Sequence, residues 1–120
     1  MPQEKLQHLQ ECIGRTEAIK LLKLVFEEGP NFLSFLNEKF RNDQLQEVKL
    51  QLANSMGGIY LYGSLELVKL CKEIVNGNSF LECSESESRA FQKTLNIELK
   101  KSFSAIDRFL HSPTKPIQEP

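Results

Sequence analysis

Few side chains in this sequence suit nucleophilic, acid–base or metal chemistry, and they lie far apart along the chain. The two histidines, His8 and His111, stand near opposite ends of the 120 residues. The three cysteines, Cys12, Cys71 and Cys83, form no C-x-x-C pair and are odd in number, which argues against a zinc site and against a disulfide framework. We therefore expect surface histidines and reduced structural thiols, with no metal, no cofactor and no catalytic site.

Carboxylates gather at two places, the pair Glu27-Glu28 and the serine-rich segment from Glu82 to Glu87. Helical bundles that hold two metal ions place Glu-x-x-His pairs on facing helices. The sequence contains no such pair. Both groups are therefore predicted to be solvated acidic faces.

The composition is that of an ordinary globular domain, with 40% hydrophobic and 26% charged residues. The net charge is −1 and the longest basic run is Lys100-Lys101, which argues against a nucleic-acid partner. The chain has no apolar run of about 18 residues and begins with the polar segment Met1 to Gln10, so neither a membrane span nor a signal peptide is predicted. We expect a cytoplasmic protein.

Helical periodicity dominates the first part of the chain, and no stretch alternates like a strand. The spacing of apolar residues predicts a short helix over residues 3–13, which ends at Gly14. A long helix over residues 16–41 is expected to be capped by Thr16 and to be kinked or split at Gly29-Pro30.

Three further helices are predicted in the second half. The first of them begins at an N-cap formed by Asn42-Asp43 and ends at Gly63. The second begins at Ser64 and runs to the turn at residues 76–79. The last helix runs from about Glu85 to Leu110, preceded by a possible capping box formed by Ser84 and Glu87.

Together these segments predict an all-α fold, an antiparallel up-and-down four-helix bundle with a short additional N-terminal helix. Residues 1–112 are expected to form one domain, and residues 113–120 a loose tail. Much of the core is expected to come from Phe32, Phe35, Phe40, Phe91, Phe103 and Phe109.

The segment from Ile13 to Val75 carries a series of features in a fixed order. Phe26 and Phe35 come first, and Asp43 follows them. The next feature is the run Leu52-Ala53-Asn54-Ser55-Met56-Gly57-Gly58. After it come Gly63-Ser64 and then the pattern L-x-x-L-C-x-x-I over Leu67 to Ile74. This series resembles the histidine-containing phosphotransfer domain, a four-helix module that relays phosphate between aspartates of receiver domains. The resemblance directly covers about half of the chain.

The chain departs from this family at the reactive position, because no histidine lies between residues 9 and 110. The family pattern is A-H-x-L-K-G-S. If Gly63 is aligned with the family's second glycine without a gap, Ala53 replaces the histidine and Met56 the lysine. If the pattern is matched letter by letter, Asn54 and Gly57 replace them, at the cost of a one-residue gap. Both registers lack the imidazole nucleophile that the relay needs.

The resemblance implies a docking surface for a receiver domain of a response regulator or hybrid kinase, on the exposed side of the helix around the missing acceptor. Glycines there would let the backbone of a partner approach closely. An alternative explanation is that the two glycines loosen the helix end or let another helix pack tightly. The expected partner-binding residues are Lys49, Gln51, Ala53, Asn54, Met56, Gly57 and Gly58.

We therefore predict a pseudo-phosphotransfer protein, which binds a receiver domain or sensor kinase and modulates the phosphorelay without accepting phosphate. Two alternatives stay open. One is a helical adaptor unrelated to two-component signalling. The other is an active phosphotransfer protein with a displaced acceptor, for which His8 and His111 are the candidates.

Overall fold

The computed structural model describes the backbone of residues 2–77 and 79–111, with the side chains of residues 5–77 and 79–111. These ranges contain α-helices and one short 3-10 helix, and no strand, which confirms the all-α prediction. Residue 112 and the predicted tail, residues 113–120, lie outside the described residues. The elements are α1 (Pro2–Ile13), α2 (Arg15–Arg41), α3 (Leu45–Tyr62), α4 (Leu65–Asn76), η1 (Ser79–Glu82) and α5 (Glu85–Leu110).

Local sequence signals determine several helix boundaries. Gly14 separates α1 from α2 with a φ of 90°, a conformation that glycine adopts without strain. The hydroxyl of Ser64 accepts a hydrogen bond from the backbone N–H of Leu67 at 3.1 Å and so caps α4. Ser84 and Glu87 form the predicted capping box of α5, with bonds of 2.8 and 3.2 Å. The predicted starts of α4 and α5 are confirmed.

Two predicted N-caps were wrong. Thr16 lies inside α2, because the carbonyl of Gly14 already accepts the first helical hydrogen bond and makes Gly14 the N-cap. The N-cap of α3 is Gln44 rather than the Asn42-Asp43 pair. Asn42 instead caps the end of α2, and Asp43 adopts a φ of 57° in the turn that follows. A short polar side chain tolerates this left-handed conformation, which is why the pair closes one helix and does not open the next.

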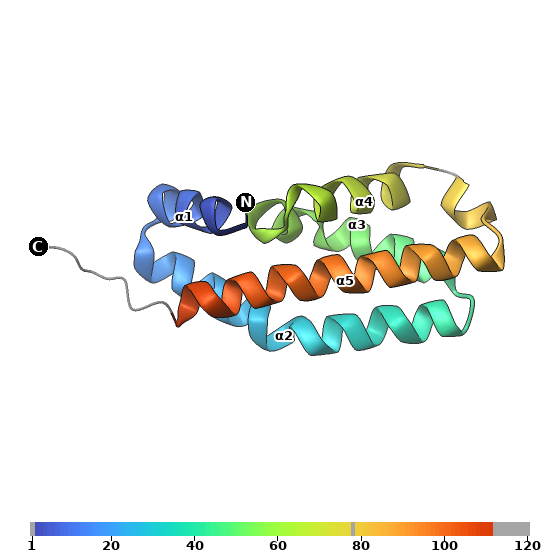
Figure 1. Cartoon of the computed structure of the whole chain (residues 1–120), viewed down its shortest axis with the longest axis horizontal. Helices are drawn as coiled ribbons and strands as arrows, with labels where there is room; N and C mark the ends of the chain where they lie inside the picture. Colours follow the sequence, from blue (N-terminus) through green and yellow to red (C-terminus); the bar gives the residue numbers. More distant parts are fainter. Residues whose placement is uncertain (1, 78, 112–120) are drawn as a thin grey trace, which may run out of the picture.

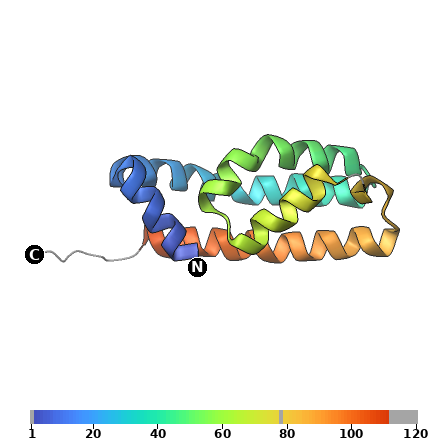
Figure 2. The ribbon, with the colours of Figure 1, turned by 90° about the horizontal axis from the view of Figure 1, so that it is seen from above.

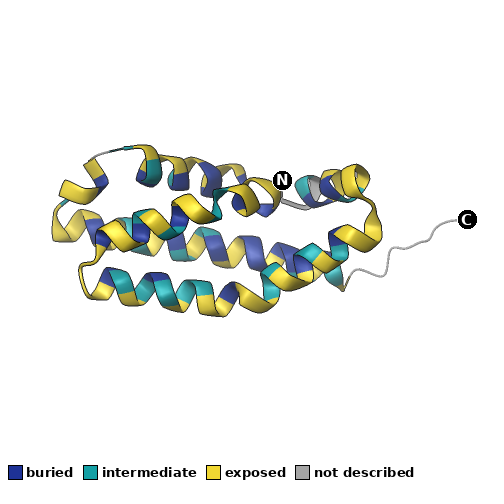
Figure 3. Ribbon diagram, turned by 180° about the vertical axis from the view of Figure 1, so that it is seen from behind, coloured by how far each residue is buried: buried dark blue, intermediate teal, exposed yellow. Residues whose placement is uncertain are grey.

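The proline at position 30 bends α2 without ending it. The helix is continuous from Arg15 to Arg41, so the predicted kink is present and the split is not. Pro30 has no N–H to donate to the carbonyl one turn earlier, and its ring crowds that carbonyl. Figures 1 and 3 show that α2 changes direction near its middle.

The helices pack lengthwise into an elongated molecule (Figures 1 and 2). The two longest helices, α2 and α5, lie side by side and make the most extensive contact in the structure. Contacts of α2 with α3, of α3 with α4 and of α4 with α5 complete a closed cycle, and α1 packs at one end against α2, α3 and α5. No described helix is both long enough and apolar enough to cross a bilayer.

Leucine and isoleucine side chains fill most of the space that the helices enclose. Figure 3 shows buried residues recurring along the helices. Cys71 lies in this core, as predicted. The largest fully buried side chains are those of Leu6, Leu22, Leu36, Leu52, Ile59, Leu67, Ile74, Phe80, Leu95, Leu99 and Ile106.

A polar network crosses the contact between α2 and α5. Asn37 and Asn96 exchange amide hydrogen bonds, from Nδ2 of Asn37 to Oδ1 of Asn96 at 2.9 Å and in the reverse direction at 2.8 Å. Gln92 donates a further bond to Oδ1 of Asn37 at 3.1 Å. All three side chains are half-buried, so the network favours a single lengthwise register of the two helices.

A different kind of contact stabilises each end of the molecule. At one end, Nζ of Lys5 on α1 donates a 2.7 Å hydrogen bond to the carbonyl of Gly63, the residue that caps α3. At the other end, Phe80 of η1 is buried edge-on between two rings, with centroid distances of 6.1 Å to Phe40 and 5.2 Å to Phe91. These contacts hold α1 and η1 against the rest of the molecule.

Candidate functional site

One side of α3 is exposed although it carries no charge. Leu50, Asn54, Gly57 and Leu61 recur at intervals of four, three and four residues, which places them on one face of the helix, with Ala53 beside them. All five are exposed, Leu50 to 50% and Leu61 to 43%. We call these five residues the α3 face.

The α3 face differs from an ordinary solvent-facing helix surface. No Asp, Glu, Lys, Arg or His occurs from Leu50 to Leu65, so the charges of α3 are confined to its beginning, at Glu47 and Lys49. Exposed apolar groups that lie together in this way are typical of protein-binding surfaces.

The two glycines of α3 are not required by packing inside this chain. A Cβ atom at Gly57 would meet no atom within 4 Å, and one at Gly58 would meet only the Tyr62 ring, at 3.8 Å. A glycine inside a helix costs about 1 kcal/mol relative to alanine. Since no neighbouring helix fills the space at either residue, tight internal packing does not explain the pair.

The structure places the seven predicted site residues in three different settings. Ala53, Asn54 and Gly57 lie together on the α3 face, and Gly58 is exposed at its edge. Met56 and Gln51 are half-buried, and Met56 packs against the core. Lys49 is turned away from the face, because its Nζ donates a 3.3 Å hydrogen bond to the carbonyl of Gly77 at the end of α4.

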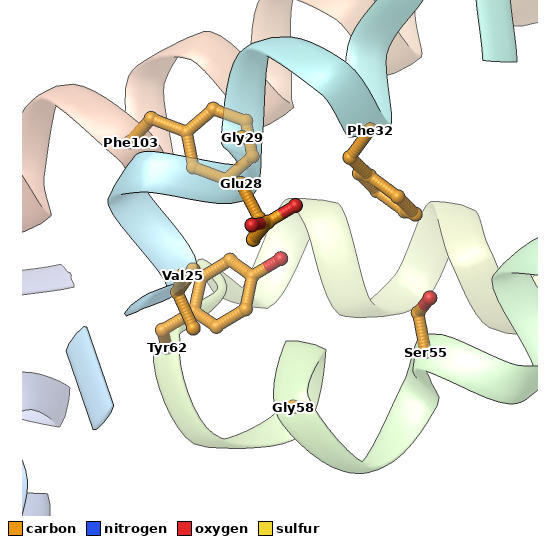
Figure 4. Close-up of a pocket in the computed structure, with 8 residues that line it drawn as sticks. All are labelled: Val25, Glu28, Gly29, Phe32, Ser55, Gly58, Tyr62 and Phe103. Carbon is orange, nitrogen blue, oxygen red and sulfur yellow. The ribbon is translucent and has the colours of Figure 1, made fainter. Parts of the chain in front are cut away.

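A pocket beside the α3 face was missed by sequence reasoning. It has a volume of about 240 Å³ and lies between α2 and α3, with α5 behind it (Figure 4). Aromatic rings from three helices line it, Phe32 of α2, Tyr62 of α3 and Phe103 of α5. The periodicity assigned phenylalanines to the core but gave no sign that rings from three helices leave a hollow between them.

Tyr62 lies between this pocket and the core. Its ring stacks on that of Phe103, with centroids 6.1 Å apart and planes inclined by 29°. Burial raises the pKa of Tyr62 well above its usual range. The negative charge that Cys71 would carry as a thiolate makes a smaller contribution in the same direction. Burial likewise raises the pKa of Cys71 to about 12. Both groups are therefore neutral at physiological pH.

The two histidines lie away from the α3 face. On α1, Nε2 of His8 is 3.5 Å from Sγ of Cys12, and both residues are exposed. His111 caps α5, with Nδ1 2.9 Å from Oδ1 of Asp107. Within residues 5–77 and 79–111, no three His, Cys, Asp or Glu side chains are grouped so that they could hold a metal ion.

No protein-family model matches this chain, and no curated protein or solved structure is significantly similar to it. The resemblance to phosphotransfer domains therefore rests on the residues between Ile13 and Val75 alone. The physical argument for a site rests on the uncharged α3 face and the pocket beside it.

Proposed function

We propose that this protein is a non-catalytic interaction module that binds a protein partner through the α3 face. The observation that carries the proposal is the exposed pair Gly57-Gly58, which no close contact among the described residues requires. Leu50 and Leu61 on either side would supply apolar contact area, and the glycines would let a partner helix approach closely. Covering this face would also remove the exposed side chains of Leu50 and Leu61 from water.

The partner class that we propose is the receiver domain of a response regulator or hybrid kinase. The order of motifs from Phe26 to Ile74 supports this choice, as does the place of Ala53 and Asn54 on the α3 face, where the family carries its acceptor. Neither an alanine methyl group nor an amide nitrogen is a usable nucleophile for phosphoryl transfer. Binding would then modulate the phosphorelay by occupying the receiver without accepting its phosphate.

We infer that the fold is an antiparallel up-and-down four-helix bundle, formed by α2, α3, α4 and α5, with α1 as the additional N-terminal helix. The closed cycle of contacts among these four helices supports this interpretation. It matches the architecture that the phosphotransfer resemblance implies.

A second candidate is a helical adaptor outside two-component signalling. The lack of charge on the α3 face favours it, because such a face offers no electrostatic preference for a receiver over any other apolar helix. The third candidate, an active phosphotransfer protein, would have to use His8 or His111, both of which are exposed. A stable phosphohistidine after incubation with a phosphorylated receiver would support that candidate.

The proposal is tested by NMR titration of the full chain with receiver domains from the same organism, with and without a phosphoryl mimic. We expect saturable shifts centred on Ala53, Asn54 and Gly57, without phosphate transfer. Leu61→Glu should abolish binding, because it places an unpaired charge in the interface.

Ile97→Glu on α5 is the matched control, since Ile97 is exposed to 44% and Leu61 to 43%. This variant should bind like the wild type. Binding that both variants retain, or that maps elsewhere, would overturn the α3-face proposal. Binding of a different protein through the α3 face, with no receiver bound, would favour the adaptor.

A further inference from the structure

The pocket between α2 and α3 combines a flat aromatic lining with open sides. Tyr62 and Phe103 stack to form one wall, and Phe32 contributes a third ring. Gly29 and Gly58 line it from opposite helices and contribute no side chain, so the pocket stays open between them (Figure 4). An engineered cavity of about 150 Å³ holds benzene, so a volume of about 240 Å³ is enough for one large side chain.

The pocket has a single charged group, Glu28 of α2. Figure 4 shows the carboxylate of Glu28 and the hydroxyl of Tyr62 projecting from opposite helices into the space that the lining residues surround. Neither group makes a hydrogen bond or ion pair with any other residue in the described part of the chain. An occupant with a positive charge and hydrogen-bond donors would satisfy both.

The pocket borders the α3 face at one edge. Its lining residue Gly58 follows Asn54 of that face by four residues, so the two are neighbours one turn apart on α3. A protein that covers the face and extends over this edge could insert a side chain into the pocket.

We propose that this pocket receives an arginine side chain of the protein that binds the α3 face, with the guanidinium group between the aromatic rings and the carboxylate of Glu28. The identity of the partner rests on the proposed function, whereas the preference of the pocket for arginine does not. A planar guanidinium stacks on aromatic rings and bonds a carboxylate through two parallel donors.

Other side chains fit this chemistry less well. A purely apolar side chain would cover Glu28 without a partner and would remove its carboxylate from water at a cost. A lysine ammonium is compact and strongly hydrated, so it cannot stack on Tyr62 as a plane. The Tyr62 hydroxyl stays protonated because burial raises its pKa, so it remains a neutral acceptor for a guanidinium N–H.

The test uses the full chain and two small probes followed by two-dimensional NMR. N-acetyl-arginine amide should give saturable shifts at the amides of Gly29 and Gly58. N-acetyl-citrulline amide has the same shape but a neutral urea, and it should bind at least about threefold more weakly. Equal binding of the two probes, no shifts at these glycines, or tighter binding of N-acetyl-lysine amide would overturn the proposal.

Two neighbouring carboxylates provide a matched pair of variants. Glu28→Gln should reduce the affinity for the arginine probe to that for the citrulline probe. Glu27→Gln changes an exposed neighbour that does not line the pocket, and it should keep the preference for arginine. Loss of the preference in both variants would overturn the assignment to Glu28.

The two proposals fail separately. The α3-face proposal is decided by receiver binding to Leu61→Glu and Ile97→Glu, and the arginine proposal is decided by the probes without any partner.

Discussion

The ring of Phe103 on α5 lies directly against the backbone of Gly29 on α2. A Cβ atom at position 29 would come within 3.0 Å of Cε2 and 3.1 Å of Cδ2 of this ring. The contact is made next to Pro30, where α2 bends. A glycine at position 29 thus lets the bent helix approach α5 closely, and it leaves the Phe103 ring free to line the pocket beside the α3 face.

Replacement of this glycine should destabilise the protein. We expect Gly29→Ala to lower the free energy of unfolding by up to about 2 kcal/mol, because overpacking costs about 1–3 kcal/mol and the gain in helix propensity offsets about 1 kcal/mol of it. Urea denaturation measures this change. Phe103→Leu in the same chain should make Gly29→Ala less costly. A stability equal to or above that of the wild type would contradict the close contact.

The same substitution at Gly57 should have the opposite effect. A Cβ at this position meets nothing within 4 Å, and Gly57 lies in the interior of α3, so Gly57→Ala should raise the free energy of unfolding by about 0.5–1 kcal/mol. The measurement is again urea denaturation, with Gly29→Ala as the contrasting variant. A loss of stability would show that position 57 contacts another part of the chain.

The paired amides of Asn37 and Asn96 should behave as a coupled unit. We expect Asn37→Leu or Asn96→Leu alone to cost about 1–3 kcal/mol, because each removes both bonds of the amide pair and leaves the other amide only its bond to Gln92. The double variant should cost less than the sum of the two, which a double-mutant cycle measures. Asn31→Leu changes an exposed asparagine of α2 outside the network and should stay within about 0.5 kcal/mol of the wild type. Additive costs would argue against the pairing.

Burial of Cys71 should make the protein less stable at high pH. Its pKa is raised from 9.0 to about 12, so the folded state holds the thiol proton more tightly than the unfolded state does. The stability that this group contributes is complete below pH 9 and should fall by on the order of 1 kcal/mol per pH unit from there towards pH 12. The raised pKa of Tyr62 acts in the same direction above pH 10.

Denaturation at pH 7 and pH 10.5 tests this expectation. Cys71→Ala should lose less stability between the two values than the wild type does. Cys12→Ala removes an exposed thiol and should show the wild-type pH dependence. An identical loss in the wild type and in Cys71→Ala would mean that another group causes it.

Local signals allowed much of the fold to be predicted. The capping box at Ser84 and the Gly63-Ser64 junction depend on residues within one turn of each other, so the sequence alone identifies them. The N-cap of α3 was missed because Asn42 and Asp43 suit a helix end as well as a helix start. The structure shows that they form the turn after α2.

The features missed by sequence reasoning are contacts between distant helices. Periodicity placed Phe103 on the inner side of its helix but could not show that its ring meets Gly29. Nor could it pair Asn37 with Asn96, because a lone polar residue near the edge of an apolar stripe gives no sign of its partner. Ala53, Asn54 and Gly57 of the α3 face were among the residues expected from the resemblance, whereas Leu50 and Leu61 were not. The absence of charge from Leu50 to Leu65 was a signal in the sequence that could have indicated these two leucines.

The order of the helices along the chain has a kinetic consequence. Only Gly63 and Ser64 separate α3 from α4, whereas the whole of α3, α4 and η1 lies between α2 and α5, whose amide pair joins residues 59 positions apart. Closing a longer loop costs more chain entropy, so α3 and α4 should meet early in folding and α2 and α5 late. Substitutions at Asn37 and Asn96 should then mainly raise the rate of unfolding. The contact between α2 and α5 would therefore determine how long the native state persists before it unfolds.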